Sequence, residues 1–291
     1  MRTLAHALSL LLLAALPACA APRQSPPCED PRPLRLALVP VKNTHTQTRQ
    51  YRPLITALEA ATGRRVQAEP AKSYGSVIEG LLAGDIDLAE VGPASYAIAM
   101  KRGAQIDPIA SFTLQPGPAT PSSRAYHSVL ITRHDHPARD LKQLRGGTLS
   151  LTDPASTSGA ILPRQAVQRL TGVPLEAYFE RITFAGAHDR SIEAVRTGRV
   201  DATFVASNAV DDAVRNGALR MDEIPILWRS TPIPYDPFVT RRSLCPALQK
   251  QIRQVFLGDT GPLQGMFREL GMTGFVPVTD EDYRDIRQLY P

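Results

Sequence analysis

The spacing of apolar and polar residues alternates along this chain between a pattern typical of strands and one typical of helices. Short apolar runs such as residues 34–39 are bounded by Pro, Gly or polar residues and have the length of buried strands. Between these runs, apolar residues recur every three or four positions, which is the spacing of a helix with one buried face. Several helical segments end at a glycine, as at Gly63 and Gly84. The alternation predicts an α/β protein with a largely parallel sheet.

Two such α/β units are predicted, and a proline-rich segment follows each. In the first unit, strands are expected over 34–39, 66–70, 86–91 and 106–113, helices over 51–62, over 74–83 and from residue 92 onward, and a polar loop over 40–50. In the second unit, strands are expected over 127–133, 148–152, 181–184, 200–206 and 224–228, and helices over 140–144, 160–170, 189–197 and 208–216. The segments 115–123 and 230–237 each hold three prolines and indicate linkers.

The last part of the chain is expected to return to the first unit. Helices are predicted over 246–257, 263–270 and 281–289. The expected organisation is a first lobe of residues 34–123 and 238–291, and a second lobe of residues 124–237. Two linkers between the lobes would let them hinge over a ligand bound in the cleft.

A short internal similarity joins the two units. The stretch Gly84-Asp-Ile-Asp-Leu-Ala89 resembles Gly198-Arg-Val-Asp-Ala-Thr203. In each stretch a glycine is expected to end a helix and lead into a strand. A turn that is common in α/β proteins also explains each stretch when it is taken alone.

The first residues have the features of an export signal. Arg2 precedes a Leu/Ala-rich run over 4–16 that is too short to span a membrane, so residues 1–18 are expected to form a signal peptide. The sequence Leu16-Pro-Ala-Cys19 resembles the bacterial lipobox, which predicts lipidation of Cys19 and a membrane anchor. The alternative is an ordinary signal that is cleaved nearby without lipidation. Residues 19–33 are rich in Pro and polar residues and are expected to form a tether.

Charge and cysteine content narrow the function classes. The net charge is +5, but basic residues are interleaved with acidic ones and form no stripe of the kind that nucleic-acid binding requires. An exported chain reaches an oxidising compartment, in which Cys28 and Cys245 could pair, so these two form a candidate disulfide. The chain has no CxxC motif or Cys/His cluster, so neither a metal site nor a cofactor is expected.

Three consecutive hydroxyl residues mark the clearest candidate site. Ser156, Thr157 and Ser158 lie where a predicted strand ends and a predicted helix begins. A helix N-terminus carries unpaired backbone N–H groups and the positive end of the helix dipole, and the hydroxyls add donors suited to a small anion. The alternative is a helix cap, because Ser and Thr are common N-caps. One cap residue explains one hydroxyl but not three in a row.

Several motifs, in order, resemble one family. They are Gly84-Asp-Ile-Asp-Leu-Ala-Glu-Val-Gly-Pro-Ala-Ser-Tyr96, Ser128-Val-Leu-Ile131, Asp140-Leu-Lys-Gln-Leu-Arg-Gly-Gly147, Asp153-Pro-Ala-Ser-Thr-Ser-Gly-Ala-Ile-Leu-Pro-Arg164, and Phe184-Ala-Gly-Ala-His-Asp-Arg-Ser191 followed by Ala194-Val-Arg-Thr-Gly-Arg-Val-Asp-Ala202. Together they resemble the phosphate/phosphite/phosphonate-binding periplasmic proteins of ABC importers, the PhnD-like group, over roughly residues 34–257. The resemblance implies a two-lobed, type II-like periplasmic binding protein with its ligand in the interlobe cleft. It also implies an ABC permease as partner, and we expect a monomer.

The resemblance also implies roles for individual residues. In such proteins the Ser156, Thr157 and Ser158 positions hold a tetrahedral oxyanion. The remaining ligand-binding candidates are Tyr74, Tyr96, His188 and Asp236, with Ser95 and Asn208 as weaker ones. Each has a structural alternative, such as a core tyrosine, a loop histidine or a turn aspartate.

Two of these candidates bear on the identity of the ligand. Asp236 would favour a ligand that carries a proton or an ammonium group, because a carboxylate repels a fully ionised anion. Asn208 stands where aminoalkylphosphonate binders of the family have Glu, which argues against 2-aminoethylphosphonate. The expected ligand is therefore a small oxyanion such as phosphite, phosphate, methylphosphonate or an arsenic species.

Three functions follow from these expectations. The first is a solute-binding protein that delivers a small oxyanion to an ABC permease. The second keeps the fold but signals to a membrane sensor kinase. The third is an exported hydrolase, in which Ser156 or Ser158 would act with His188 and Asp236 as a triad. The third is the weakest, because the chain has no G-x-S-x-G motif, so we expect no enzyme activity.

Overall fold

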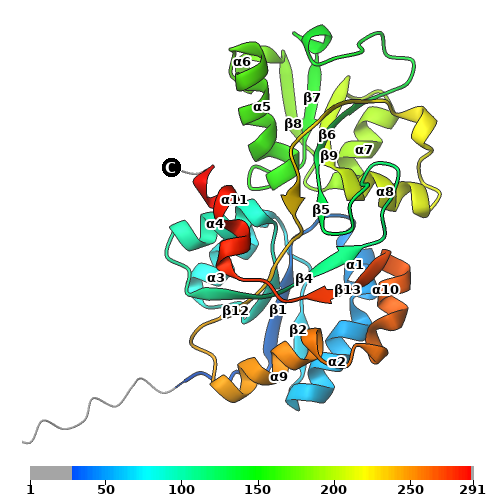
Figure 1. The fold of residues 1–291 in the computed structure, drawn as a ribbon. Coiled ribbons are helices and arrows are strands. Elements are labelled where there is room, and N and C mark those ends of the chain that lie inside the picture. Colours follow the sequence, from blue (N-terminus) through cyan, green and yellow to red (C-terminus); the bar gives the residue numbers. More distant parts are fainter. Residues whose placement is uncertain (1–27, 290–291) are drawn as a thin grey trace, which may run out of the picture.

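The computed structural model describes residues 28–289 and contains two lobes, each built on a β-sheet (Figure 1). The expected signal peptide, Cys19 and residues 19–27 of the expected tether lie outside the described residues. Helices cover both faces of each sheet, and the chain crosses twice between the lobes. The predicted α/β class with two linked lobes is thereby confirmed.

Lobe 1 is the part built on a six-stranded sheet of order β13-β4-β12-β3-β1-β2. Its strands are β1 (Leu34–Leu38), β2 (Val66–Ala68), β3 (Leu88–Glu90), β4 (Ile106–Leu114), β12 (Phe238–Arg241) and β13 (Met272–Val276). Only the pairs β1–β2 and β1–β3 are parallel, whereas β12 pairs antiparallel with β3 and β4, and β13 pairs antiparallel with β4. The prediction of a largely parallel sheet is wrong here, because β12 returns from the other lobe and inserts between β3 and β4.

Seven helices of lobe 1 pack on this sheet in the described part of the chain. They are α1 (Thr44–Gln50), α2 (Arg52–Thr62), α3 (Tyr74–Ala83), α4 (Pro93–Lys101), α9 (Pro246–Leu257), α10 (Gln264–Leu270) and α11 (Arg284–Gln288). The sequence predicted a loop at α1. The Asn43 side chain caps this helix, and its buried residues are the glutamines Gln47 and Gln50. The Gln47 amide donates to the carbonyl of Val39. Helices are recognised in a sequence by apolar residues that recur every three or four positions. α1 buries polar side chains instead, so this signal is missing.

Lobe 2 is the part built on a five-stranded sheet of order β10-β6-β9-β7-β8. Its strands are β6 (Ser128–Thr132), β7 (Thr148–Leu151), β8 (Arg181–Phe184), β9 (Ala202–Ala206) and β10 (Ile226–Arg229). Its helices are α5 (Leu162–Thr171), α6 (Leu175–Tyr178), α7 (His188–Arg196) and α8 (Ser207–Arg215). Strand β7 is parallel to β8 and β9, while β6 is antiparallel to β9 and β10. This sheet is therefore also mixed.

The two crossings between the lobes pair with each other. β5 (Ala125–Tyr126) and β11 (Ile233–Pro234) form a short antiparallel ladder between the two sheets (Figure 1). Backbone hydrogen bonds thus restrain each crossing, in addition to the φ angles that its prolines fix. The tyrosine of β5 stacks on Tyr235, with ring centroids 5.5 Å apart.

Alternating side chains fill a separate core on each face of each sheet. In β9, Phe204 packs in one cluster and Val205 packs in the cluster on the other face. In β1, Leu36 and Ala37 divide between the two clusters of lobe 1 in the same way. This is the two-residue period of a strand that is buried on both faces. It explains why the strands appear in the sequence as short continuous apolar runs.

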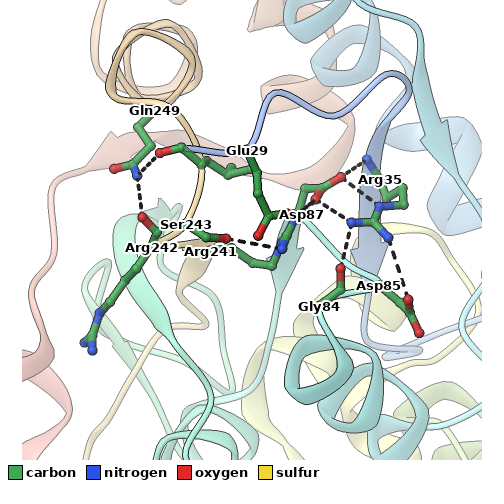
Figure 2. Close-up of polar contacts among 10 residues, drawn as sticks. Glu29, Arg35, Gly84, Asp85, Asp87, Arg241, Arg242, Ser243 and Gln249 are labelled. Carbon is green, nitrogen blue, oxygen red and sulfur yellow. Dashed lines mark hydrogen bonds and ion pairs between the residues drawn. The ribbon is translucent and has the colours of Figure 1, made fainter. Parts of the chain in front are cut away.

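The start of the described chain is fastened to lobe 1 rather than free. Cys28 forms a disulfide with Cys245, and Glu29 pairs with the backbone at Leu244. Figure 2 shows Arg241 between two acids: its Nη2 lies 2.7 Å from the Glu29 carboxylate and 2.6 Å from that of Asp87. Residues 28–33 of the expected tether therefore belong structurally to lobe 1.

Asp87, which is fully buried, is the centre of this network (Figure 2). Arg35 donates to it from its backbone N–H, at 2.8 Å, and from its guanidinium. Burial alone would raise the pKa of Asp87, but the hydrogen bonds from Arg35 and Arg241 outweigh burial and lower it. Charge-assisted bonds from two guanidinium groups thus make the burial of this carboxylate tolerable.

Candidate functional site

The Ser156–Ser158 run lies between β7 and α5, at the face of lobe 2 that meets lobe 1. Ser156 caps a π-helical turn over Thr157–Ile161, and its Oγ accepts the N–H of Gly159 at 3.1 Å. The three hydroxyl residues are only 1–2% exposed. The capping role that sequence reasoning offered as an alternative is therefore real for Ser156. It accounts for one of the three hydroxyls.

Lobe 1 contacts this run directly. The N–H of Ala94, in the first turn of α4, donates to Thr157 Oγ1 at 2.8 Å. The Ser95 hydroxyl donates to the carbonyl of Ala155 at 3.0 Å, and the N–H of Tyr74 donates to Asp153 Oδ2 at 3.3 Å. The two lobes are therefore joined at the hydroxyl run by backbone and side-chain hydrogen bonds.

These bonds leave the hydroxyls of Ser156 and Thr157 to act as donors. A hydroxyl has one donor and two acceptor positions. In both residues a backbone N–H occupies an acceptor position, so the O–H remains for another partner. An arrangement that presents O–H donors in a buried site suits an anion.

Two tyrosines adjoin the hydroxyl run. Within residues 28–289, the buried hydroxyl of Tyr74 has no hydrogen-bond partner. Burial, and after it the carboxylates of Asp236 and Asp153, raise the pKa of Tyr74, while the nearby Ser156 side chain lowers it. The side chains of Thr157 and Ser158 likewise act on the pKa of buried Tyr126, which burial raises. Tyr74 from α3 and Tyr126 from the first crossing therefore approach the run from lobe 1 and from the hinge.

His188 begins α7 and is held in one tautomer. Its Nδ1 accepts the N–H of Ala206 at 3.2 Å and lies 3.0 Å from the Thr152 hydroxyl. Because Nδ1 accepts, the neutral ring carries its proton on Nε2. Burial lowers the pKa of His188 to about 4, so the ring is neutral at physiological pH. The backbone N–H of His188 donates across the cleft to the carbonyl of Val41 at 3.0 Å.

Two buried carboxyl groups, Glu90 and Asp236, lie close enough at the interlobe cavity for the charge of one to act on the other. Asp236 lies in the second crossing, and Glu90 ends β3 beside it. Burial, and then the Glu90 charge, raise the pKa of Asp236 well above its usual value. Burial raises the pKa of Glu90 to about 7, against the opposing effects of Tyr51 and Lys42. Protonation of such a pair is favoured because two buried carboxylates repel each other.

A cavity of about 300 Å³ lies between the lobes and brings part of the predicted site together. His188, Asp236 and Asn208 line it, along with Glu90 and Tyr126. The hydroxyl run and Tyr74 do not line this cavity. In the described chain its two basic residues, Lys42 and Arg215, both pair with Asp212. Among the described residues, the cavity therefore has neutral hydrogen-bond donors beside it but no unpaired Lys or Arg in its lining.

The structure does not bring Tyr96 together with the other candidates. Its hydroxyl donates to Asp280 Oδ1 at 2.7 Å, and its ring packs edge-on against Tyr283. The side chain is part of the core of lobe 1. Ser95, the weaker candidate, uses its hydroxyl to join the lobes through Ala155. Sequence reasoning placed Tyr96 near a helix N-terminus, but the residue lies one helical turn into α4, and its hydroxyl bonds Asp280 rather than approaching the hydroxyl run.

The geometry required by the hydrolase alternative is absent from the described residues. In a triad, the acid accepts from the imidazole N–H that is remote from the nucleophile. Here Nδ1 of His188 itself accepts a backbone N–H and makes no hydrogen bond to Asp236. Among residues 28–289 there is also no group of three or more His, Cys, Asp or Glu placed to hold a metal ion. No helix within that range has the length and apolar character needed to cross a bilayer.

Sequence reasoning missed Glu90 and Tyr126. Both line the cavity. Glu90 lies within the quoted family motif of residues 84–96 but was not singled out there, and Tyr126 lies outside every quoted motif. A weak signal existed for Glu90, because it is an acidic residue at the end of an otherwise apolar strand. Tyr126 lies beside the first linker, where no periodicity distinguishes a site residue from a core residue.

Comparisons with known proteins agree with this architecture. The family model described as ABC transporter, phosphonate, periplasmic substrate-binding protein matches residues 36–283. The phosphate-import protein PhnD of Mycolicibacterium smegmatis is 30% identical over 280 residues, covering 89% of this chain and 85% of that protein. The phosphonates-binding periplasmic protein of Escherichia coli is 27% identical over 267 residues, covering 90% and 77%.

A solved structure shows the same fold. It is a binding protein component of an ABC phosphonate transporter from Pseudomonas aeruginosa, with a TM-score of 0.80 at 22% identity, covering 89% of this chain and 86% of that one. Family model and relatives are substrate-binding transport proteins rather than enzymes, and the family is periplasmic. This chain therefore belongs to the periplasmic phosphonate-binding proteins of ABC transporters.

Proposed function

We propose that the protein binds a small phosphorus oxyanion, namely phosphite, phosphate or a small phosphonate, between its lobes and delivers it to an ABC permease. The observation that carries this proposal is the buried hydroxyl run, in which Ser156 and Thr157 keep their O–H groups as donors. Tyr74, Ser158 and the Nε2–H of His188 complete the proposed donor set. A tetrahedral oxyanion has several oxygens that can each accept from such donors.

The names of relatives support this ligand class without choosing within it. One relative is named for phosphate import, another for binding phosphonates, and one solved neighbour holds methylphosphonate. The similarities are to transport proteins, so they support delivery to a permease over signalling to a sensor kinase. Arsenite and arsenate, the arsenic species considered for a sensing role, are included in the ligand screen. We further propose that the protein acts as a monomer held at a membrane through Cys19, which lies outside the described residues.

Calorimetric titration of the exported protein with phosphite, phosphate, methylphosphonate, sulfate, arsenite and arsenate tests the ligand class. We expect a saturable heat with at least one phosphorus oxyanion and none with sulfate. Sulfate is fully ionised at neutral pH and has no proton to offer Asp236. If no phosphorus compound binds at millimolar concentration, the proposal is wrong.

Two tyrosine variants separate the proposed site from the sequence-based one. Tyr74→Phe removes one donor to the anion, and hydrogen bonds to charged groups contribute about 1.5–3 kcal/mol, so we expect affinity to fall roughly 10- to 100-fold. Tyr96→Phe is the matched control. It should leave affinity unchanged but lower the melting temperature, because the hydroxyl bonds Asp280. Equal effects of both variants on affinity would contradict this assignment.

A further inference from the structure

Glu90 is a buried acidic residue at the cavity that the proposed anion donors do not require. It is 3% exposed and lines the cavity from lobe 1. Within residues 28–289, its Oε2 has no hydrogen-bond partner. We infer that Glu90 is a specificity-determining residue that accepts a hydrogen bond from a donor on the bound phosphorus compound, a role that rests on the function proposed above.

The backbone fixes the position of this carboxyl group. Glu90 ends β3, opposite Leu38 of β1 and Phe238 of β12. Asp236, two residues before Phe238, lines the same cavity. Glu90 thus reaches the cavity from the end of a strand, and Asp236 reaches it from the segment that leads into the neighbouring strand β12. A strand holds the Glu90 carboxyl more rigidly than a loop would.

No cation in the described chain pairs with Glu90. Lys42 acts on it through space, but Lys42 Nζ bonds Asp212 at 2.5 Å. The nearby Tyr51 hydroxyl lowers the pKa of Glu90, but burial outweighs this effect. The other charged or titratable groups that line the cavity are His188, Asp189 and Asp212 from lobe 2, Arg215, and Tyr126 and Asp236 from the crossings. Among them, the histidine, the tyrosines and a protonated Asp236 offer neutral donors.

An unsatisfied buried carboxylate oxygen is costly, so native proteins rarely keep one without a reason. Burial raises the pKa of Glu90 to about 7, which shows how poorly its charge is compensated. A ligand donor that reaches Oε2 would supply the missing bond. Such a donor would bind more tightly than an isosteric ligand without it, because the latter would leave the acid unpaired.

The opposite wall of the cavity strengthens this inference. Asn208, at the start of α8, lines the cavity and has a buried Oδ1 without a partner in the described chain. Two oxygen acceptors, one from each lobe, therefore face a space of about 300 Å³. The shared chemistry they recognise is a hydrogen-bond donor, either a P–OH group or an ammonium group on a substituent. The expectation against amine-bearing ligands considered position 208 alone and overlooked Glu90.

Calorimetric titration of wild type and Glu90→Gln with methylphosphonate and 2-aminoethylphosphonate tests the inference. If the donor is an ammonium group, Glu90→Gln should weaken 2-aminoethylphosphonate at least tenfold and leave methylphosphonate nearly unchanged. If the donor is P–OH, both affinities should fall by similar factors. Either result supports the inference that Glu90 accepts a hydrogen bond from a donor group of the ligand.

The inference is overturned if Glu90→Gln binds both compounds as tightly as wild type, or more tightly. Glu79→Gln is the matched control, because Glu79 is an exposed acid of lobe 1 that pairs with Arg102. Circular dichroism and thermal melting establish that each variant folds. If Glu90→Gln does not fold, Glu90→Asp retains the charge but withdraws it by one methylene, and should reproduce the selective loss. If wild type binds none of the phosphorus oxyanions of the ligand screen, the proposed function fails, and this inference falls with it. If wild type binds only phosphite or phosphate, wild type and Glu90→Gln are compared with that ligand, and equal affinities overturn the inference.

Discussion

At the scale of single residues, the site is distinguished by neutral groups whose orientation is fixed by backbone bonds. Thr157 and His188 each accept a backbone N–H, from Ala94 and Ala206 respectively. These bonds determine which proton each side chain can donate. The site can therefore offer donors to an anion without a buried cation, which would carry a large desolvation cost.

The buried His188 makes the protein sensitive to acid. Its pKa is lowered from 6.5 to about 4, so folding disfavours its protonation. The contribution is fully present above pH 6.5 and is lost as pH falls towards 4, at most about 3 kcal/mol. His188→Asn keeps an acceptor for Ala206 but does not titrate. Urea unfolding at pH 7.5 and 4.5 should show a smaller acid-induced loss for this variant than for wild type.

A loss of equal size in both proteins would mean that other groups dominate the acid sensitivity. His134→Asn serves as the control, because His134 is an exposed histidine of lobe 2. It should lose as much stability in acid as wild type does.

At the scale of elements, the two similar stretches that begin at Gly84 and Gly198 form the same local structure, one in each lobe. Gly84 and Gly198 have left-handed φ values of 75° and 71° and follow α3 and α7. Three residues later in each lobe, an aspartate accepts a backbone N–H from the first or second residue of the parallel neighbour strand. Asp87 accepts from Arg35 at 2.8 Å, and Asp201 accepts from Thr148 at 2.7 Å. Each aspartate therefore sets the register at which two parallel strands begin.

Sequence patterns located most strands and helices, because their apolar periods match the cores they face. They failed where burial and polarity do not coincide, as in α1 with its buried Gln47 and Gln50. They also failed for β12 and β13, which are short and pair with strands far away in the chain. For the site, the hydroxyl run was visible as a motif, whereas Glu90 acquires its role only through the approach of β12 and the other lobe.

The disulfide at the start of the described chain is expected to stabilise lobe 1 without affecting the site. It closes a loop of 217 residues, for which chain-entropy reasoning gives a stabilisation of at most about 5 kcal/mol. The double variant Cys28→Ser/Cys245→Ser should therefore unfold at a lower urea concentration. Its calorimetric affinity for the ligand should equal that of wild type. A changed affinity with unchanged stability would contradict this separation.

At the scale of the whole molecule, the lobes meet through contacts at the cavity and away from it. Lys42 bonds Asp212, the N–H of Asn43 donates to Asp189 at 2.8 Å, and Gln165 of α5 donates to the carbonyl of Leu289 at 3.3 Å. Each of these joins residues of opposite lobes. Opening the cleft must break them together, so they hold the lobes closed.

Removing one such contact should shorten the lifetime of the complex. Asp212→Asn breaks the ion pair with Lys42 of the other lobe and the pair with Arg215 within α8. Both pairs are partly exposed, so we expect ligand dissociation to accelerate only about two- to tenfold. The association rate should change little. Stopped-flow measurement with the ligand found by calorimetry checks this. Asp222→Asn removes an exposed ion pair with Arg220 outside the cavity and should leave both rates unchanged.

The place of β12 in the sheet of lobe 1 has a consequence for the order in which the protein assembles after export. Lobe 2 uses only consecutive strands, from β6 to β10, so it can fold as soon as those residues have crossed the membrane. Lobe 1 lacks a central strand until residue 241 has emerged, because β12 separates β3 from β4. The sheet of lobe 1 therefore stays incomplete until the later half of the chain has been exported. We expect lobe 1 to be the part that depends on protection from aggregation during secretion.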